Sequence, residues 1–284
     1  MGAADGSIFT RRTVVIDGIN VPCLEGGTAR EVEPVLYLHG LGGGGKWESF
    51  HMAMATVTQT TAPNLPGWSG PGPVESLKSP SDYAALCTKL LDALELPRVV
   101  LVGHSIGATI AAQMAVAAPE RLSRLVLIDP LGLEVPQAPG TDLATLDEEA
   151  FGTAVFAKLG LTARAQAYGF GAEWENVRSG PEFERQWKGR SLVVEHLGGA
   201  LPDAALTERL KQLDLPVLLV WGQEDGIVPV RQGEVLRAAL PYARIEVVEK
   251  AAHLPMTERA ETTNRVIRDF LVGVNDPIEG VVSV

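Results

Sequence analysis

The chain has 284 residues, of which 46% are hydrophobic and 21% charged, and this ordinary globular usage excludes a disordered chain, a collagen-like repeat and a coiled coil. The length fits one large domain or one domain with an insertion. With 24 Lys and Arg against 35 Asp and Glu, the net charge of −11 repels phosphate backbones, so we expect no nucleic-acid partner.

In chain order, the predicted elements begin with an antiparallel hairpin, because residues 13–17 and 19–24 flank an Asp17-Gly18 turn. Continuous apolar runs, typical of strands buried on both faces, follow at residues 34–39, 99–103, 125–129, 217–222 and 245–249. Helical patterns lie between or after these strands, at residues 81–94, 108–118 and 259–272. This alternation predicts an α/β fold with a mostly parallel sheet and helices on both faces.

Residues 131–205 break this alternation, because they contain no convincing strand. They hold seven of the chain's 16 aromatic residues, namely Phe151, Phe156, Tyr168, Phe170, Trp174, Phe183 and Trp187. Such a set can form the core of a small helical unit, and its apolar underside can also face a pocket. The sequence therefore predicts a helical insertion at this point.

The sharpest chemical motif is Gly103-His104-Ser105-Ile106-Gly107, which lies between a predicted strand and a helix rich in small residues. It matches the G-x-S-x-G turn that exposes a serine nucleophile. A turn this tight holds the serine in strained backbone geometry, and the glycines let the strand and the helix pass closely. The helix N-terminus also favours negative charge developing beside it. The motif predicts that Ser105 is a nucleophile and not a buried structural serine.

A serine nucleophile needs a base, and the chain offers five histidines. His253 lies in the loop after the last predicted strand, where its side chain reaches the carboxyl edge of the sheet. His39 ends a strand in a His-Gly pair and is expected to be structural. We therefore predict His253 as the base.

The base in turn needs an acid to orient it. Asp225 follows the predicted strand 217–222, and the chain order Ser105, Asp225, His253 is the one expected for this motif. Two alternatives stay open. Glu224 is adjacent to Asp225, and Asp129 ends another strand.

These motifs, together with His39-Gly40-Leu41-Gly42 and Trp221-Gly222-Gln223-Glu224-Asp225, make the chain resemble the α/β-hydrolase fold family from Ile8 to Val274. The resemblance implies an eight-stranded, mostly parallel sheet. It also implies that residues 131–205 are a helical cap (lid), inserted after the sixth strand into a core made of residues 1–130 and 206–284. Asn64-Leu65-Pro66-Gly67-Trp68-Ser69 departs from the family's pattern, which affects the pocket's shape and not the triad.

The resemblance also assigns a binding site around the nucleophile. It implies an oxyanion hole made by the backbone N–H groups of Leu41 and Ile106. We expect Gly40 and Gly42 to line the substrate site, together with Trp174 of the predicted cap.

The glycine-rich run from Gly40 to Lys46 has two phosphate-binding alternatives. It satisfies G-x-x-x-x-G-K, but Trp47 stands where a P-loop needs Ser or Thr. It also satisfies G-x-G-x-x-G, but no acidic residue occurs between Glu48 and Glu75 to hold a ribose. The glycines suit a loop whose amides approach a substrate oxyanion better than they suit a nucleotide site.

A serine nucleophile excludes the epoxide-opening and halide-displacing chemistry of relatives that use a carboxylate there. It favours hydrolysis of a carboxylic ester through an acyl-enzyme. We expect a neutral, largely apolar small-molecule substrate, because the basic residues of the predicted cap should be solvated: Lys158, Arg164, Arg178, Arg185, Lys188 and Arg190. The same triad could instead cleave a carbon–carbon bond or open a lactone, and a ligand receptor with a retained triad is a third reading.

The remaining expectations concern cofactors and location. No His, Cys, Asp or Glu cluster has metal-ligand spacing, so we expect neither a metal nor another cofactor. Cys23 and Cys87 are expected to be small buried residues. No apolar stretch of signal-peptide or membrane-helix length occurs, so we expect a cytoplasmic protein with no membrane partner. The oligomeric state stays open.

Overall fold

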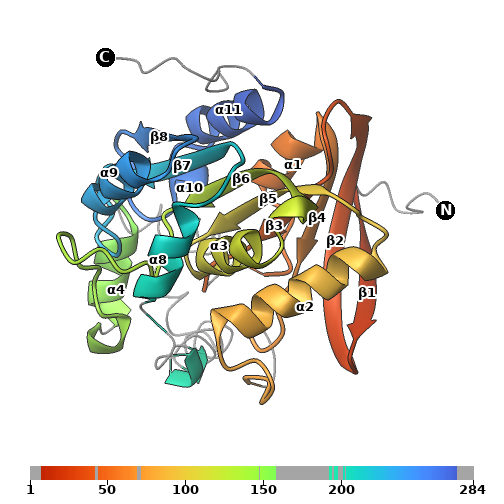
Figure 1. The fold of residues 1–284 in the computed structure, drawn as a ribbon, viewed down its shortest axis with the longest axis horizontal. Helices are drawn as coiled ribbons and strands as arrows, with labels where there is room; N and C mark the ends of the chain where they lie inside the picture. Colours follow the sequence, from red (N-terminus) through yellow and green to blue (C-terminus); the bar gives the residue numbers. More distant parts are fainter. Residues whose placement is uncertain are drawn as a thin grey trace.

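The computed structural model of the chain describes residues 8–41, 44–68, 72–146, 148–157, 192–193, 195–197, 201 and 203–273. In this part of the chain eight strands form one sheet: β1 (Phe9–Ile16), β2 (Ile19–Arg30), β3 (Val35–Leu38), β4 (Thr58–Pro63), β5 (Val99–His104), β6 (Leu122–Ile128), β7 (Val217–Gly222) and β8 (Ala243–Val248). Their order across the sheet is β1-β2-β4-β3-β5-β6-β7-β8. The first two pairings, β1 with β2 and β2 with β4, are antiparallel, and all others are parallel. The predicted eight-stranded, mostly parallel sheet is confirmed (Figure 1).

The central strands are buried on both faces, which explains why they read as continuous apolar runs. Along β5, Leu101 packs into the core on one face of the sheet and Val102 into the core on the other. The register aligns Leu101 with Leu36 of β3 and with Leu125 of β6. All three side chains pack into the same core, so aliphatic side chains continue from strand to strand.

Helices cover both faces of the sheet. One face carries α2 (Pro80–Ala93), α3 (Ile106–Ala117), α8 (Ala204–Leu210) and α9 (Val230–Ala239). The other carries α1 (Ser49–Ala55), α10 (Pro255–Glu258) and α11 (Ala260–Leu271). Figure 1 shows α2 and α3 on the opposite side of the sheet from α1 and α11. The predicted helix at 81–94 is α2, where the Ser79 side chain caps the helix by accepting from the Asp82 N–H.

Strand β4 was not predicted, because its sequence Thr-Gln-Thr-Thr-Ala-Pro is not an apolar run. Thr58, Thr60 and Thr61 are nevertheless fully buried. β-branched threonine fits the pleated surface of a strand, and its hydroxyl can find an acceptor nearby. Thr58 Oγ1 does so by donating to the carbonyl oxygens of Val32 and Glu33, both at 3.1 Å.

The terminal helical pattern at 259–272 also differs from the structure in its boundaries. The pattern corresponds to α11, and a further short helix that was not predicted, α10, precedes it; the two are separated at Arg259, which leaves helical geometry with φ −134° and ψ 49°. Pro255 at the start of α10 suits the first turn of a helix, which places the helical segment closer to His253 than the pattern indicated.

Only parts of the predicted cap lie among the described residues. They include the short 3-10 turn Leu143–Thr145 and α4 (Glu148–Val155). Leu133 and Asp203 form a β-bridge, and the Asp203 N–H donates to the Gly132 carbonyl at 3.0 Å. The two ends of the segment therefore lie side by side, as an insertion requires, and the domain boundaries stay a prediction.

Two smaller expectations concern cysteines and membranes. Cys23 and Cys87 are both buried and free, as expected. In the described part of the chain, no helix combines the length and the apolar character needed to cross a membrane.

Candidate active site

Three loops carry Ser105, Asp225 and His253 to one edge of the sheet. The strands β5, β6, β7 and β8 run parallel, so their carboxyl ends meet at that edge. Ser105 directly follows β5, Asp225 follows β7, and His253 lies between β8 and α10. The carboxyl edge is where open α/β sheets place their ligands.

Ser105 occupies the strained turn that the motif predicted. Its backbone has φ 56° and ψ −124°, a conformation that L-residues rarely adopt. Close packing around the turn explains the flanking glycines. A Cβ on Gly103 would overlap the backbone of α3, and a Cβ on Gly107 would overlap the carbonyl groups at the end of β3. The glycines thus let β5, α3 and β3 approach closely enough to hold the serine in place.

The three predicted side chains form a continuous hydrogen-bonded row. Ser105 Oγ lies 2.8 Å from His253 Nε2, and His253 Nδ1 lies 2.8 Å from Asp225 Oδ2. An ionised carboxylate can only accept, so Nδ1 carries the imidazole proton and Nε2 is left to accept the proton of Ser105. All three residues are buried, with 3%, 6% and 9% of the surface of Ser105, His253 and Asp225 exposed. This geometry allows His253 to take the proton as Ser105 attacks an electrophile.

Backbone groups hold the acid in position. Asp225 Oδ1 accepts the N–H of Ile227 at 2.7 Å and the N–H of Val228 at 2.9 Å. The second oxygen, Oδ2, is thereby turned towards His253. The Asp225 carboxylate therefore accepts three hydrogen bonds. The adjacent Glu224, one alternative acid, is exposed to solvent.

Two further histidines near the row have structural partners. His39 Nδ1 donates to the Gly40 carbonyl at 2.7 Å, and its Nε2 accepts the Leu65 N–H at 3.0 Å. Burial lowers the pKa of His39 to about 4. His104 donates from Nε2 to the His253 carbonyl at 2.7 Å, and burial, with His253 as a second cause, lowers its pKa to about 3. Both imidazoles are therefore neutral supports at neutral pH.

Asp129, the other alternative acid, lies beside Asp225 and outside the row. It follows β6, is fully buried, and accepts the Gly222 N–H on Oδ1 at 2.9 Å. Burial raises the pKa of Asp129 well above its usual range, and the neighbouring Asp225 carboxylate raises it further. The described contacts join His253 to Asp225 and not to Asp129.

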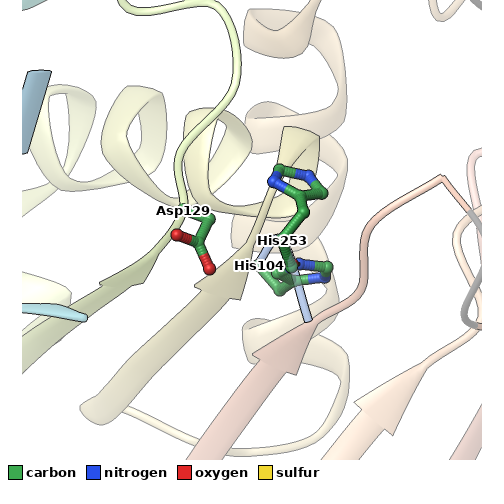
Figure 2. Close-up of side chains that lie close together, drawn as sticks. All are labelled: His104, Asp129 and His253. Carbon is green, nitrogen blue, oxygen red and sulfur yellow. The ribbon is translucent and has the colours of Figure 1, made fainter. Parts of the chain in front are cut away.

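The structure brings together one set of possible metal ligands that the sequence analysis did not anticipate. Figure 2 shows His104, Asp129 and His253 close together, and one ligand atom from each lies within 4.8 Å of the others. They come from the ends of different strands, so no local spacing reveals them. Both ring nitrogens of His253 already bond to Ser105 and Asp225, so a cation there would have to break the row. The expectation that the protein needs no metal stays a prediction.

The residues assigned to the oxyanion hole lie next to the nucleophile. Ile106 is the first residue of α3, so its N–H has no acceptor within the helix. Gly40 packs against the turn, because a Cβ there would lie 3.0 Å from Ser105 Cβ and 2.8 Å from His104 Nδ1. Leu41, which follows it, is half-buried. Gly42 and Trp174 lie outside the described residues.

Hydrogen bonds that the sequence did not predict join the predicted cap to the two loops that carry the acid and the base. The N–H of Gly226 donates to the Ala154 carbonyl, and the N–H of His253 donates to the Val155 carbonyl, both at 3.0 Å. Glu258 completes the link, since its carboxylate accepts the N–H of Ala157 at 2.8 Å and that of Ala252 at 2.7 Å. No sequence pattern identifies Glu258, because its partners are backbone N–H groups, one of them 101 residues away along the chain.

Comparison with known proteins supports the resemblance seen in the sequence. Residues 33–260 match the alpha/beta hydrolase fold family. The chain is 30% identical, over 84% of its length and 87% of the relative's, to 2-hydroxy-6-oxononadienedioate/2-hydroxy-6-oxononatrienedioate hydrolase 2 of Pseudomonas putida.

Two solved structures show the same fold. A membrane phospholipase A described as a bacterial virulence factor superposes with a TM-score of 0.77 and 25% identity, covering 94% of this chain and 87% of that one. The meta-cleavage product hydrolase of Pseudomonas fluorescens IP01 gives a TM-score of 0.73 at 20% identity, covering 93% and 98% of the two chains.

Proposed function

The chain belongs to the α/β-hydrolase fold family, and we propose that it is a serine hydrolase that cleaves a carboxylic ester of a neutral, largely apolar small molecule through an acyl-enzyme. One observation carries this proposal. Ser105, His253 and Asp225 form a buried row joined by two hydrogen bonds of 2.8 Å. Such a row supplies the nucleophile, the general base and the orienting acid that acyl transfer to water uses.

In the first half of the proposed reaction, Ser105 Oγ attacks the ester carbonyl and His253 Nε2 takes the serine proton. Asp225 keeps the Nδ1 proton in place and stabilises the imidazolium that forms. The carbonyl oxygen becomes an oxyanion, which the N–H groups of Leu41 and Ile106 would hold. Loss of one such donor typically costs about 10²- to 10³-fold in rate.

In the second half, the roles of His253 are reversed. The imidazolium gives its proton to the leaving alcohol, and a water molecule takes the alcohol's place. His253 then accepts a proton from that water as its oxygen attacks the acyl group on Ser105. The bond between the acyl carbon and Ser105 Oγ then breaks, His253 returns the proton to Oγ, and the carboxylic acid leaves.

The predicted cap would select the substrate. The carbonyl groups of Ala154 and Val155 in the predicted cap accept the N–H groups of Gly226 and His253, so a cap over the site would be coupled to the positions of Asp225 and His253. The net charge of −11 disfavours anionic substrates at long range, which supports a neutral ester.

A burst experiment tests the proposal. With excess nitrophenyl ester, the native protein should release one equivalent of nitrophenol per site rapidly before slower steady turnover. Ser105→Ala should lose the burst, because no acyl-enzyme can form. Ser123→Ala is the matched control, since Ser123 is half-buried on β6 and its hydroxyl donates to the Val99 carbonyl at 3.3 Å. Near-native turnover by Ser105→Ala would show that the proposed nucleophile is wrong.

A second candidate function is cleavage of a carbon–carbon bond by the same three residues. The Pseudomonas putida relative favours it, because that enzyme is named as the hydrolase of an oxo-dienedioate. Such a reaction on a carboxylated substrate needs a cationic site for the substrate carboxylate. The basic residues of the predicted cap that could supply it, Lys158 to Arg190, lie outside the described residues.

The two candidates differ in their preferred substrate charge. We expect a higher kcat/KM for a neutral ester than for the same ester with an added carboxylate, and a smaller difference between them at high salt. A clear preference for a carboxylated vinylogous diketone, lost when Arg178 or Arg190 is replaced by Gln, would assign the protein to carbon–carbon cleavage.

A further inference from the structure

Two buried carboxyl groups lie together at the ends of neighbouring strands β6 and β7. Asp129 is fully buried, and its backbone has φ 43°, in the left-handed region that residues other than glycine rarely adopt. Asp129 and Asp225 both lie beside His253, since Asp225 Oδ2 is 2.8 Å from His253 Nδ1 and an Asp129 carboxylate oxygen lies within 4.8 Å of a His253 ring nitrogen. Strain of this kind persists only where the surroundings hold the residue in place.

The two carboxyl groups have unequal sets of donors. Asp225 receives the Ile227 and Val228 N–H groups on Oδ1 and His253 Nδ1 on Oδ2. Asp129 receives the Gly222 N–H on Oδ1, and its buried Oδ2 meets no donor among the described residues. Two adjacent buried carboxylates cannot both stay ionised, so the pair holds a proton. That proton belongs on the group with fewer donors, which is Asp129.

We propose that Asp129 is a positioning residue whose protonated Oδ2 donates a hydrogen bond to the Asp225 carboxylate. The inference rests on the proposed function, because it gives Asp129 a task in the row of Ser105, His253 and Asp225. The added bond would hold the Asp225 carboxylate in place together with the Ile227 and Val228 N–H groups. It also draws negative charge away from the carboxylate that faces His253.

The other titratable groups around Asp129 do not supply a positive charge that would ionise it. His104 and His253 are the imidazoles beside it, and burial keeps His104 neutral, with a pKa of about 3. Glu258, on α10, is a further acidic group whose charge raises the pKa of Asp129. Asp225 acts in the same direction. Every acidic neighbour therefore favours the protonated form.

The test is the pH dependence of kcat/KM in two variants. Asp129→Asn replaces the O–H donor by an amide N–H donor and keeps an oxygen for Gly222, so its acidic limb should stay at the native pH. Asp129→Ala removes the donor, so Asp225 presents more charge to His253. Its acidic limb should move upwards by roughly half to one pH unit. A structural role alone would change the rate of both variants without this difference in pH profile.

Three results would overturn the proposal. If both variants moved the limb downwards, Asp129 would be ionised in the native protein. If neither moved it, Asp129 would not act on the row. If Asp129→Asn lost as much activity as Asp225→Asn, Asp129 would itself be the acid.

Stability provides a readout that does not depend on turnover. A buried acid with a raised pKa costs stability as the pH rises above its ordinary value of about 3.9, and Asp129→Asn removes that cost. The free energy of unfolding of Asp129→Asn, relative to the native protein, should therefore increase from pH 4 to pH 8. A constant difference would contradict a protonated Asp129, even if Ser105 proved not to be a nucleophile. The two proposals can therefore fail separately.

Discussion

Replacing Asp225 by Asn is the most informative perturbation of the row, because the structure predicts which way the new amide turns. Asp225 Oδ1 accepts two backbone N–H groups, at 2.7 and 2.9 Å. The amide oxygen of Asn must keep that place, since an NH₂ group there would face two donors. The NH₂ group is then directed at His253 Nδ1, which can only accept from it.

The imidazole proton consequently moves to Nε2, where it points at Ser105 Oγ. His253 can no longer accept the serine proton, so the base is blocked while the geometry is retained. In a serine protease the same substitution costs about 10⁴-fold in kcat, which corresponds to about 5 kcal/mol of transition-state stabilisation. We expect a loss of that order in kcat for ester hydrolysis, with little change in the free energy of unfolding.

The assay is steady-state hydrolysis of a neutral nitrophenyl ester, with the rate of fluorophosphonate labelling as a second measure. Glu224→Gln is the matched control, because Glu224 is the adjacent acid and is exposed. It should retain near-native kcat. An Asp225→Asn variant within about tenfold of the native rate would refute the reasoning, since one effective donor or acceptor is usually worth more than that.

Four further outcomes are expected. Gly107→Ala should lower both the unfolding temperature and the labelling rate, because its Cβ would overlap the carbonyl groups at the end of β3; unchanged values would contradict the tight packing of the turn. Glu258→Gln should lower the free energy of unfolding by about 1–3 kcal/mol and slow hydrolysis, because the single amide oxygen can accept only one of the two N–H groups. The control variant Glu261→Gln, at an exposed position, should change neither quantity. The free energy of unfolding should decrease as the pH falls from about 6.5 towards 4, because buried neutral His39, His51 and His104 have lowered pKa values and the unfolded chain binds protons first; these three imidazoles outweigh the opposite contribution of Asp129, whose pKa is raised, and a flat profile by denaturant titration would contradict this. Chelator should leave hydrolysis unchanged, and activity that is lost in chelator and restored by a divalent ion would contradict the proposed mechanism.

Features of the fold and of the site could be predicted from the sequence wherever their signal is a local pattern of residues. The apolar runs predicted the buried strands, and the glycines around Ser105 predicted a close, strained turn, because both signals lie within a few residues. Strand β4 was not predicted, because its buried residues include three threonines in place of an apolar run. Asp129 and Asp225 both fit the chain order Ser, Asp, His, so the order alone left both acids open, and the proximity of the two carboxyl groups depends on the pairing of β6 with β7. Glu258 could not be found, because its partners, Ala157 and Ala252, are brought to it only by the fold.

The most direct test of the account is to trap the acyl-enzyme and locate it. The native protein is mixed with a slowly deacylating ester, quenched in acid and digested, and the peptides are analysed by mass spectrometry. The account predicts one acyl adduct, on Ser105, that is absent from the Ser105→Ala variant. Continued turnover with no adduct, or with an adduct on another residue, would contradict the claim that Ser105 is the nucleophile.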